Sequence, residues 1–216
     1  MLARRKERLD ALHDELGAHA IAVPADVTNL DALAHAVDEA GAALGGLDGV
    51  IAVAGKTMAG SILTGDPQKW RELFDLNLIA PLATVRAAFP HFPATGRRDV
   101  VFVGSTGAMT PLPSTAVYAA SKRGLRAAFE TLRLELAPSG VNVGLVMPGM
   151  FETEGLTLEG LVIDGDVPPN DFPLFAPGTA PASPDALGDI IAFMLGLPEG
   201  LCINELVARP TGQLTP

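Results

Sequence analysis

A tyrosine and a lysine one helical turn apart are the first residues of this sequence that could perform chemistry together. Residues 114–124 read STAVYAASKRG, in which Lys122 follows Tyr118 by four positions. Tyr118 is also the only tyrosine in the 216 residues. Side chains four positions apart share one face of a helix, so the phenol and the ammonium can point the same way. Taken alone, the pair could equally be a half-buried tyrosine beside a solvated lysine, because such spacings arise by chance.

Two more polar residues have unusual positions. Ser105 directly follows the apolar run DVVFVG and precedes Tyr118 by thirteen residues. A serine there can also be an ordinary turn or helix-cap residue. Asn77, in FDLNLIAP, lies at the centre of an apolar helical pattern, where asparagine is a poor helix former. Either its side chain satisfies one buried hydrogen bond, or it marks a helix that is distorted to bind water.

Short β-branched runs alternate with longer helical patterns along the chain. The predicted strands cover residues 20–25, 49–54, 99–104, 141–147 and 202–208. The predicted helices cover residues 4–17, 29–44, 67–91, 115–137 and 184–195. Apolar strands separated by helices indicate a parallel sheet covered on both faces. The sequence therefore predicts one domain over residues 1–216, with a doubly wound, Rossmann-like α/β/α fold in three layers.

Small and polar residues gather where four of these strands end. The stretches are ADVTN at 25–29, AGKT at 54–57, GSTG at 104–107 and PGMFET at 148–153. Ligands of doubly wound sheets bind beyond the carboxyl ends of the strands. Together the four stretches therefore predict one binding site, although each alone would be an ordinary turn.

Composition excludes several classes of partner. The formal net charge of −10 repels phosphate backbones, so we expect no nucleic-acid binding. No stretch approaches the ~20 apolar residues of a membrane span, and the N-terminus lacks the apolar region of a secretory signal. The single Cys202 forms no internal disulfide and lies in the apolar run GLCINELV, which indicates a buried structural thiol. We expect a cytoplasmic protein with no membrane partner.

Asn77, Ser105, Tyr118 and Lys122 together resemble the constellation of the short-chain dehydrogenase/reductase family. The resemblance extends over essentially the whole chain, and the DV at 26–27 and the PG at 148–149 stand where that family has them. The tail, INELVARPTGQ, resembles the subgroup of NADP-dependent 3-hydroxy-acid and serine dehydrogenases. The resemblance implies an oxidoreductase that transfers hydride between NADP(H), or alternatively NAD(H), and a small alcohol or carbonyl substrate.

The resemblance also implies a role for each of the four residues. Tyr118 would exchange a proton with the substrate oxygen while the cofactor carries the hydride. A phenol has an ordinary pKa near 10, and we expect Lys122 to lower the pKa of Tyr118 and to bind the nicotinamide ribose. Ser105 would donate to the substrate oxygen. Asn77 would hold a water that links Lys122 to solvent.

Further residues are implied as cofactor contacts. Asp26 would accept the adenine amino group, with the backbone of Val27 beside it. Arg4 and Arg5 would meet the 2′-phosphate of NADP, although they could also be an exposed basic cluster. The remaining implied contacts, besides Tyr118 and Lys122 themselves, are Ala54, Gly55, Pro148, Gly149 and Thr153.

The sequence departs from the family at its beginning. The family starts with a strand, a TGxxxGxG turn that brings backbone N–H groups to the pyrophosphate, and a helix; here the first strand and first helix are missing. Because that strand lies at the centre of the sheet, we expect strand 20–25 to have no neighbour and strand 49–54 to have one unpaired, aggregation-prone edge. Either the sequence given lacks a leading segment, which the retained catalytic residues favour, or the protein is a shortened relative. A second departure is AVAG at 52–55 in place of NNAG, which affects the adenine side only.

Two functions therefore remain open. The first is the oxidoreductase, and the alternative is a truncated, non-catalytic binding or scaffold protein with little cofactor affinity. In the family the helices corresponding to 67–91 and 115–137 pair between subunits, so we expect a homodimer or homotetramer. The apolar residues that would allow this pairing are Leu73, Leu76, Val85, Phe89, Leu125, Phe129, Leu132 and Leu136. Residues 150–183, rich in proline, glycine and acids, are expected to form a lid that sets specificity.

Overall fold

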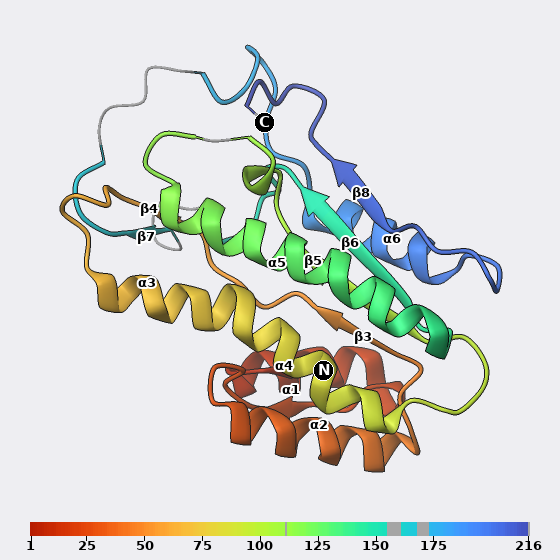
Figure 1. Ribbon diagram of the computed structural model, residues 1–216. Coiled ribbons are helices and arrows are strands. Elements are labelled where there is room, and N and C mark those ends of the chain that lie inside the picture. The colour runs from red at the N-terminus through yellow and green to blue at the C-terminus, as the bar shows by residue number, and fades with distance from the viewer. Residues whose placement is uncertain (111, 155–160, 168–172, 216) are drawn as a thin grey trace.

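The computed structural model describes residues 1–110, 112–154, 161–167 and 173–215, and its centre is a parallel sheet (Figure 1). The strands of this sheet, in spatial order, are β3 (Gly49–Ala52), β5 (Asp99–Val103), β6 (Asn142–Pro148) and β8 (Glu205–Ala208). All three pairings between them are parallel. The predicted parallel sheet is confirmed, and each strand lies within two or three residues of its predicted bounds.

Helices cover both faces of the sheet, which gives the three predicted layers. On one face lie α4 (Ala80–Ala88) and α5 (Ala116–Leu136), and on the other lies α6 (Pro184–Leu195). In β5, Val100 and Phe102 pack toward α5, whereas Val101 and Val103 pack toward α6. This alternation follows from the two-residue repeat of side chains along a strand. It places the carboxyl end of β5 between the helix layers.

The first part of the chain forms a separate small sheet, and here one prediction is wrong. The strand predicted at 20–25 is not isolated: β2 (Val23–Pro24) pairs in parallel with β1 (Leu2–Ala3). The helices α1 (Lys6–Leu16) and α2 (Leu30–Leu44) follow these two strands. A two-residue strand shows no periodicity in the sequence, which is why β1 was not predicted.

The second prediction about the sheet agrees with the structure. Among the described residues β3 has β5 as its only paired strand, so its other edge is open. A cavity of about 340 Å³ lies along that edge, between the two sheets. Its lining is mostly apolar and includes Leu33 and Val37 of α2 and Val50 and Ala52 of β3. Open backbone groups at such an edge cost about 1–3 kcal/mol each where they are shielded from water.

The predicted helix at 67–91 is interrupted at Asn77. The helix α3 (Pro67–Phe74) begins after the capping residue Asp66, whose side chain accepts a hydrogen bond from the backbone N–H of Gln68. A π-helical segment, Asp75–Ile79, joins α3 to α4. Single π-helical turns inside a helix frequently occur at functional sites.

Part of the predicted lid lies outside the described residues. Of residues 150–183, positions 155–160 and 168–172 are not described. In the described part, β7 (Val162–Ile163) pairs in parallel with β4 (Met58–Ala59), and Phe175 bridges to Gln213. The segment is therefore attached to the body of the protein at two places at least.

The residues expected to pair between subunits divide into two groups. Leu73, Val85, Leu125 and Phe129 are each at most 3% exposed and belong to the interior, so these four residues take part in core packing. Phe89 is 41% exposed, Leu76 is half-buried, and Leu132 and Leu136 lie partly buried against the core. Core packing and subunit pairing require the same apolar residue types, so the sequence alone did not separate them. In the part of the chain that is described, no helix has the length and apolar character needed to cross a bilayer.

Candidate active site

Tyr118 and Ser105 meet at the carboxyl end of β5. Ser105 follows that strand and caps the short turn Thr106–Ala108, its Oγ accepting from the N–H of Gly107 at 3.1 Å. Gly107 allows a close approach, because a Cβ there would lie 3.3 Å from Cε1 of Tyr118. The Tyr118 hydroxyl is a hydrogen-bond partner of the hydroxyls of Ser105 and Thr57. Ser105 therefore caps the short turn and is also a hydrogen-bond partner of Tyr118.

The ionisation of Tyr118 differs from the expectation. Burial raises the pKa of Tyr118, and the hydrogen bonds of Ser105 and Thr57 oppose this rise only in part. The expected lowering by Lys122 is therefore wrong for this arrangement, in which desolvation of the phenolate decides the direction of the shift. A phenol with a raised pKa is protonated at neutral pH, which suits the donation of a proton.

Lys122 lies one helical turn further along α5 and is buried, with 5% of its surface exposed. Its Nζ donates to the carbonyl oxygen of Val103 at 3.0 Å. Burial lowers the pKa of Lys122 to about 8. An ammonium has three N–H donors, and this carbonyl takes one of them. Lys122 therefore has donor capacity available for a ligand at the carboxyl end of the sheet.

Asn77 holds the loop after β3 against α5. Its Nδ2 donates to the carbonyl oxygen of Lys56 at 2.9 Å and to Oγ of Ser121 at 3.1 Å, and its Oδ1 accepts from the N–H of Lys56 at 2.9 Å. Ser121 in turn donates to the carbonyl oxygen of Tyr118 at 2.7 Å. Both interpretations of Asn77 hold in part: the helix is distorted, and the side chain is satisfied within the protein. The water beside Asn77 stays a prediction.

Gly55 lies between the two polar groups of this arrangement. A Cβ at this position would be 3.1 Å from Oδ1 of Asn77 and 3.3 Å from Nζ of Lys122. Both distances are shorter than ordinary van der Waals contacts, so an added methyl group must displace at least one of the two atoms.

We therefore expect Gly55→Ala to lower turnover by roughly 10- to 100-fold, since small displacements of positioned groups have effects of this size. Melting temperature should change little, because Gly55 is exposed and has a negative φ. Steady-state kinetics and thermal unfolding of the variant test this. Gly188→Ala, in α6 with open space around its position, is the control. Equal activity of the two variants would contradict the expected effect.

Asp26 and Arg4 lie at the carboxyl end of the small sheet. Oδ1 of Asp26 accepts from the N–H of Thr28 at 2.9 Å and from its hydroxyl at 2.7 Å, and these bonds lower the pKa of Asp26. Arg4 lies 3.7 Å from Oδ2 of Asp26. Arg5 donates to Glu154 at 2.8 Å, and Arg8 also pairs with Glu154. The basic residues predicted to meet a phosphate are therefore paired with carboxylates in this structure.

The other implied cofactor contacts lie at the ends of three strands. Gly149 donates its N–H to Ala208 and lies so close to Gln213 that a Cβ would be 2.3 Å from Oε1. Thr153 is exposed. Val27 packs against an apolar cluster that includes Leu33 and Val37 of α2, and Ala54 lines the cavity beside β3. Pro148 is the last residue of β6.

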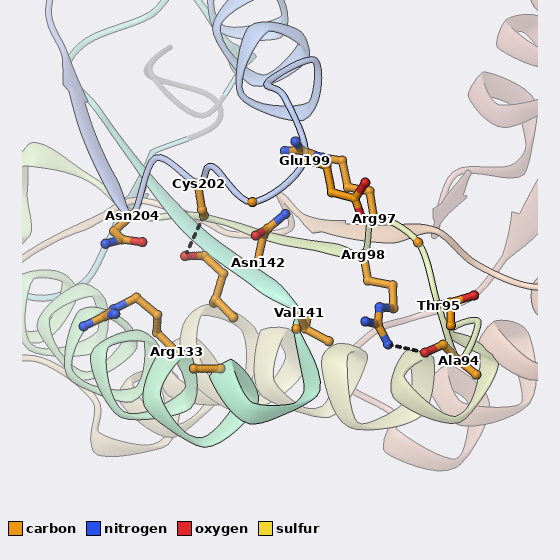
Figure 2. Close-up of a pocket in the computed structure, with 15 residues that line it drawn as sticks. Ala94, Thr95, Arg97, Arg98, Arg133, Val141, Asn142, Glu199, Cys202 and Asn204 are labelled. Atoms are coloured by element: carbon orange, nitrogen blue, oxygen red, sulfur yellow. Dashed lines mark hydrogen bonds between the residues drawn. The ribbon is translucent and has the colours of Figure 1, made fainter.

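A larger cavity, of about 560 Å³, is not the catalytic site. Figure 2 shows the residues that line it: they come from the segments before β5, β6 and β8, from the first residues of β6 and from Arg133 of α5, at the amino ends of these strands. There Cys202 donates to the carbonyl oxygen of Val143 at 3.6 Å, and burial raises the pKa of this thiol. The predicted structural, unreactive role of Cys202 agrees with both observations.

Two residues with clear contacts in the site were not predicted. Thr57 contacts the Tyr118 hydroxyl, and Ser121 links Asn77 to the backbone of Tyr118. Both lie within stretches that the sequence had already marked, AGKT and STAVYAASKRG. Nothing in the sequence distinguishes them from ordinary turn or helix hydroxyls, so only their contacts identify them.

Known proteins with similar sequences and structures support one family. Residues 1–159 match the short chain dehydrogenase family. An uncharacterized oxidoreductase of Staphylococcus aureus is 26% identical over 211 residues, covering 97% of this chain and 85% of the relative. A short-chain dehydrogenase from Streptomyces avermitilis superposes with a TM-score of 0.81 at 25% identity, covering 96% of this chain and 77% of that one. A metagenomic short-chain oxidoreductase in complex with NADP gives a TM-score of 0.77 at 27% identity, covering 97% and 84%.

The sequence match covers well over half of the chain, and in this structure Ser105, Tyr118 and Lys122 lie at the carboxyl end of β5. The chain therefore belongs to the short-chain dehydrogenase family of nicotinamide-dependent oxidoreductases.

Proposed function

We propose that this protein reduces small carbonyl compounds with NADPH, and oxidises the corresponding alcohols in reverse, with Tyr118 as the acid and base. The observation that carries the proposal is the Tyr118 hydroxyl, held between the hydroxyls of Ser105 and Thr57 with its pKa raised by burial. A phenol in this state donates a proton readily only to an oxygen that gains negative charge. A carbonyl oxygen gains such charge as it is reduced.

Each residue has one task in this mechanism. Tyr118 donates its proton to the substrate oxygen, and Ser105 donates a second hydrogen bond to the same oxygen, which stabilises the negative charge that develops there. Thr57 orients the phenol. When bound, the nicotinamide cofactor supplies the hydride. Asn77 and Ser121 fix the loop after β3 to the helix that carries Tyr118.

The residues present fit the nicotinamide and ribose part of such a cofactor. The buried Nζ of Lys122 has one carbonyl partner and N–H groups to spare, which suits the hydroxyl oxygens of a ribose. Gly55 gives a close backbone approach to Lys122, because a Cβ there would lie 3.3 Å from Nζ. The sequence contains no TGxxxGxG turn for the pyrophosphate, so we expect the affinity of this chain for NADPH to be low.

The proposal is tested with a panel of small aldehydes, ketones and keto acids. Each compound is incubated with the protein and NADPH or NADH, and loss of the reduced nicotinamide absorbance is followed. Turnover with at least one compound supports the proposal. No turnover at cofactor concentrations that saturate binding would instead favour the non-catalytic binding protein.

Arg4 and Arg5 are proposed to select NADP. Replacing both with alanine should weaken NADPH binding by roughly 10-fold or more and NADH binding far less, because each guanidinium can pair with the 2′-phosphate. Fluorescence titration of both reduced cofactors measures this. Equal losses for the two cofactors would contradict the assignment.

Glu154→Gln provides a matched test with the opposite sign. Glu154 forms ion pairs with Arg5 and Arg8 in the structure, so a phosphate that binds Arg5 must compete with the carboxylate of Glu154. Removing this charge should strengthen NADPH binding and leave NADH binding nearly unchanged. A variant with unchanged affinity for both cofactors would show that Arg5 does not meet the phosphate.

A further inference from the structure

Asp164 is a buried carboxylate that the proposed mechanism does not use. Its side chain is 3% exposed. Both of its oxygens accept from the backbone N–H of Asp66, at 3.1 and 3.0 Å, and Oδ2 also accepts the indole N–H of Trp70 at 2.8 Å. Nζ of Lys69 lies 3.4 Å from Oδ1. Four contacts from one short stretch thus converge on one carboxylate.

These contacts keep Asp164 ionised. Burial alone would raise the pKa of Asp164, but the hydrogen bonds from Asp66, Trp70 and Lys69 outweigh it and hold this pKa below its usual value. The carboxylate also lies at the N-terminus of α3, where the helix dipole favours a negative charge. Asp164 is therefore a fixed charged anchor on α3 at neutral pH.

The backbone around Asp164 is joined to β4. Val162 donates its N–H to the carbonyl oxygen of Thr57 at 3.1 Å, and Asp164 donates its N–H to that of Ala59 at 2.9 Å. At Gly60 the backbone of the segment after β4 touches the backbone of Asp164, since a Cβ at Gly60 would lie 1.7 Å from the carbonyl oxygen of Asp164. A side chain at that position would force the two segments apart. The anchored residue and β4 therefore have one fixed relative position.

β4 in turn reaches the helix of Tyr118 at two points. Thr57, the residue before β4, is a hydrogen-bond partner of the Tyr118 hydroxyl. Gly60, the residue after β4, donates its N–H to the carbonyl oxygen of Ser114 at 2.7 Å. Ser114 has a φ of 61°, a conformation that non-glycine residues rarely adopt, and it lies two residues before α5 begins. A displacement of β4 therefore acts on both the phenol and the start of its helix.

We propose that Asp164 is a positioning residue for Tyr118, which fixes β7 on α3 and through β4 holds the Thr57 hydroxyl against the phenol. The proposal deepens the function proposed above and rests on it for its catalytic meaning. Its structural core, the link from Asp164 to Tyr118, is independent of any activity.

The link can be measured directly, because Tyr118 is the only tyrosine in the chain. Phenolate absorbance during an alkaline titration therefore reports Tyr118 alone. The Thr57 hydrogen bond lowers the pKa of Tyr118, so Thr57→Val should move the titration to higher pH. Asp164→Asn places an amide N–H against the donors of Asp66 and Trp70, which should release β7 and move the titration in the same direction.

The double variant distinguishes this link from a general loss of structure. If Asp164 acts through Thr57, adding Asp164→Asn to Thr57→Val should produce little further shift, since interacting positions are not additive. Asp166→Asn is the matched control, because this exposed residue is two positions away and loses the same charge. Circular dichroism of each sample ensures that only folded protein is compared.

Trp70→Phe is a milder variant should Asp164→Asn fold poorly. It removes one donor to Asp164 and keeps an aromatic ring, so a smaller shift in the same direction is expected. In the reduction assay Asp164→Asn should lower kcat by roughly 10- to 100-fold, with KM for the cofactor nearly unchanged. An unshifted titration in folded Asp164→Asn and Trp70→Phe, or fully additive shifts in the double variant, would overturn the proposal. Absence of turnover in the unmodified protein would instead count against the proposed function and leaves the titration valid.

Discussion

Replacement of Tyr118 with phenylalanine is expected to reduce turnover by about 10²–10⁴-fold, the range attributed to a positioned acid or base. The change removes the proton that is donated to the substrate oxygen and keeps the ring that packs against Gly107. The Ser105 and Thr57 hydroxyls lose one common partner, which should lower the free energy of unfolding by about 1 kcal/mol. We therefore expect a large loss of activity with only a small loss of stability. The measurements are steady-state reduction of the best substrate of the panel and the melting temperature of the same samples.

The pH dependence of the unmodified enzyme gives a second readout of the same group. Because burial raises the pKa of Tyr118, the phenol is protonated throughout the neutral range, and its proton should not limit reduction there. Alcohol oxidation requires the deprotonated group, the phenolate of Tyr118, to accept a proton from the alcohol, so its rate should increase toward alkaline pH. Thr57→Val retains the phenol and serves as the matched variant, with a smaller loss of activity than Tyr118→Phe. A phenylalanine variant that keeps normal turnover would eliminate Tyr118 as the acid.

The sequence was sufficient for the strands of the central sheet and for its long helices. Apolar runs such as DVVFVG and the amphipathic helix that carries Tyr118 follow regular repeats, so β5 and α5 lie within one residue of their predicted bounds. The carboxyl ends of parallel strands meet at one edge, which is why the stretch GSTG with Ser105 could be expected in the site. That Tyr118 lies beside Ser105 was implied by the resemblance to the family.

Contacts between short segments could not be predicted. The strands β1, β4 and β7 have two residues each, too few for any repeat, and their pairing depends on chain segments far away in sequence. The same holds for Asp164, a single carboxylate in an acidic, glycine-rich stretch. Its partners Asp66 and Trp70 lie nearly 100 positions earlier, and only the folded chain brings them to it.

The pKa of Tyr118 was wrongly predicted for a related reason. The spacing of Tyr118 and Lys122 places both side chains on one face of α5 but does not determine how deeply either is buried. In the structure Nζ of Lys122 is directed to the carbonyl oxygen of Val103, and burial determines the ionisation of both groups. Desolvation is a property of the packed protein, so a sequence motif cannot give its magnitude.

Replacement of Lys122 is expected to lower activity and to raise the stability of the fold. Burial of its ammonium lowers the pKa of Lys122 from 10.5 to about 8. At about 1.4 kcal/mol per pKa unit, this shift corresponds to a destabilisation of about 3 kcal/mol while the group is charged. The hydrogen bond to Val103 offsets this by about 1 kcal/mol. Lys122→Met, which is nearly isosteric and uncharged, should therefore raise the free energy of unfolding by about 2 kcal/mol.

The sign of its pH dependence follows from the same shift. Below pH 8 both folded and unfolded Lys122 are protonated, so the full penalty of the buried charge is present. Between about pH 8 and 10.5 the folded state loses its proton first, the unfolded state binds more protons, and the stability of the unmodified protein rises with pH. The difference between Lys122→Met and the unmodified protein should therefore be widest below pH 8 and should shrink across this window.

Denaturant unfolding at a series of pH values measures this difference, with Lys6→Met as the control because Lys6 is exposed and pairs with the exposed Asp10. The methionine variant should at the same time lose turnover by orders of magnitude. It should also bind nicotinamide cofactors more weakly, because the N–H donors of Lys122 are gone. Functional groups are often held in surroundings that lower the stability of the protein. A Lys122 that destabilises the fold and supports the reaction would fit this expectation. A methionine variant that is both less stable and fully active would show that Lys122 has a structural role instead.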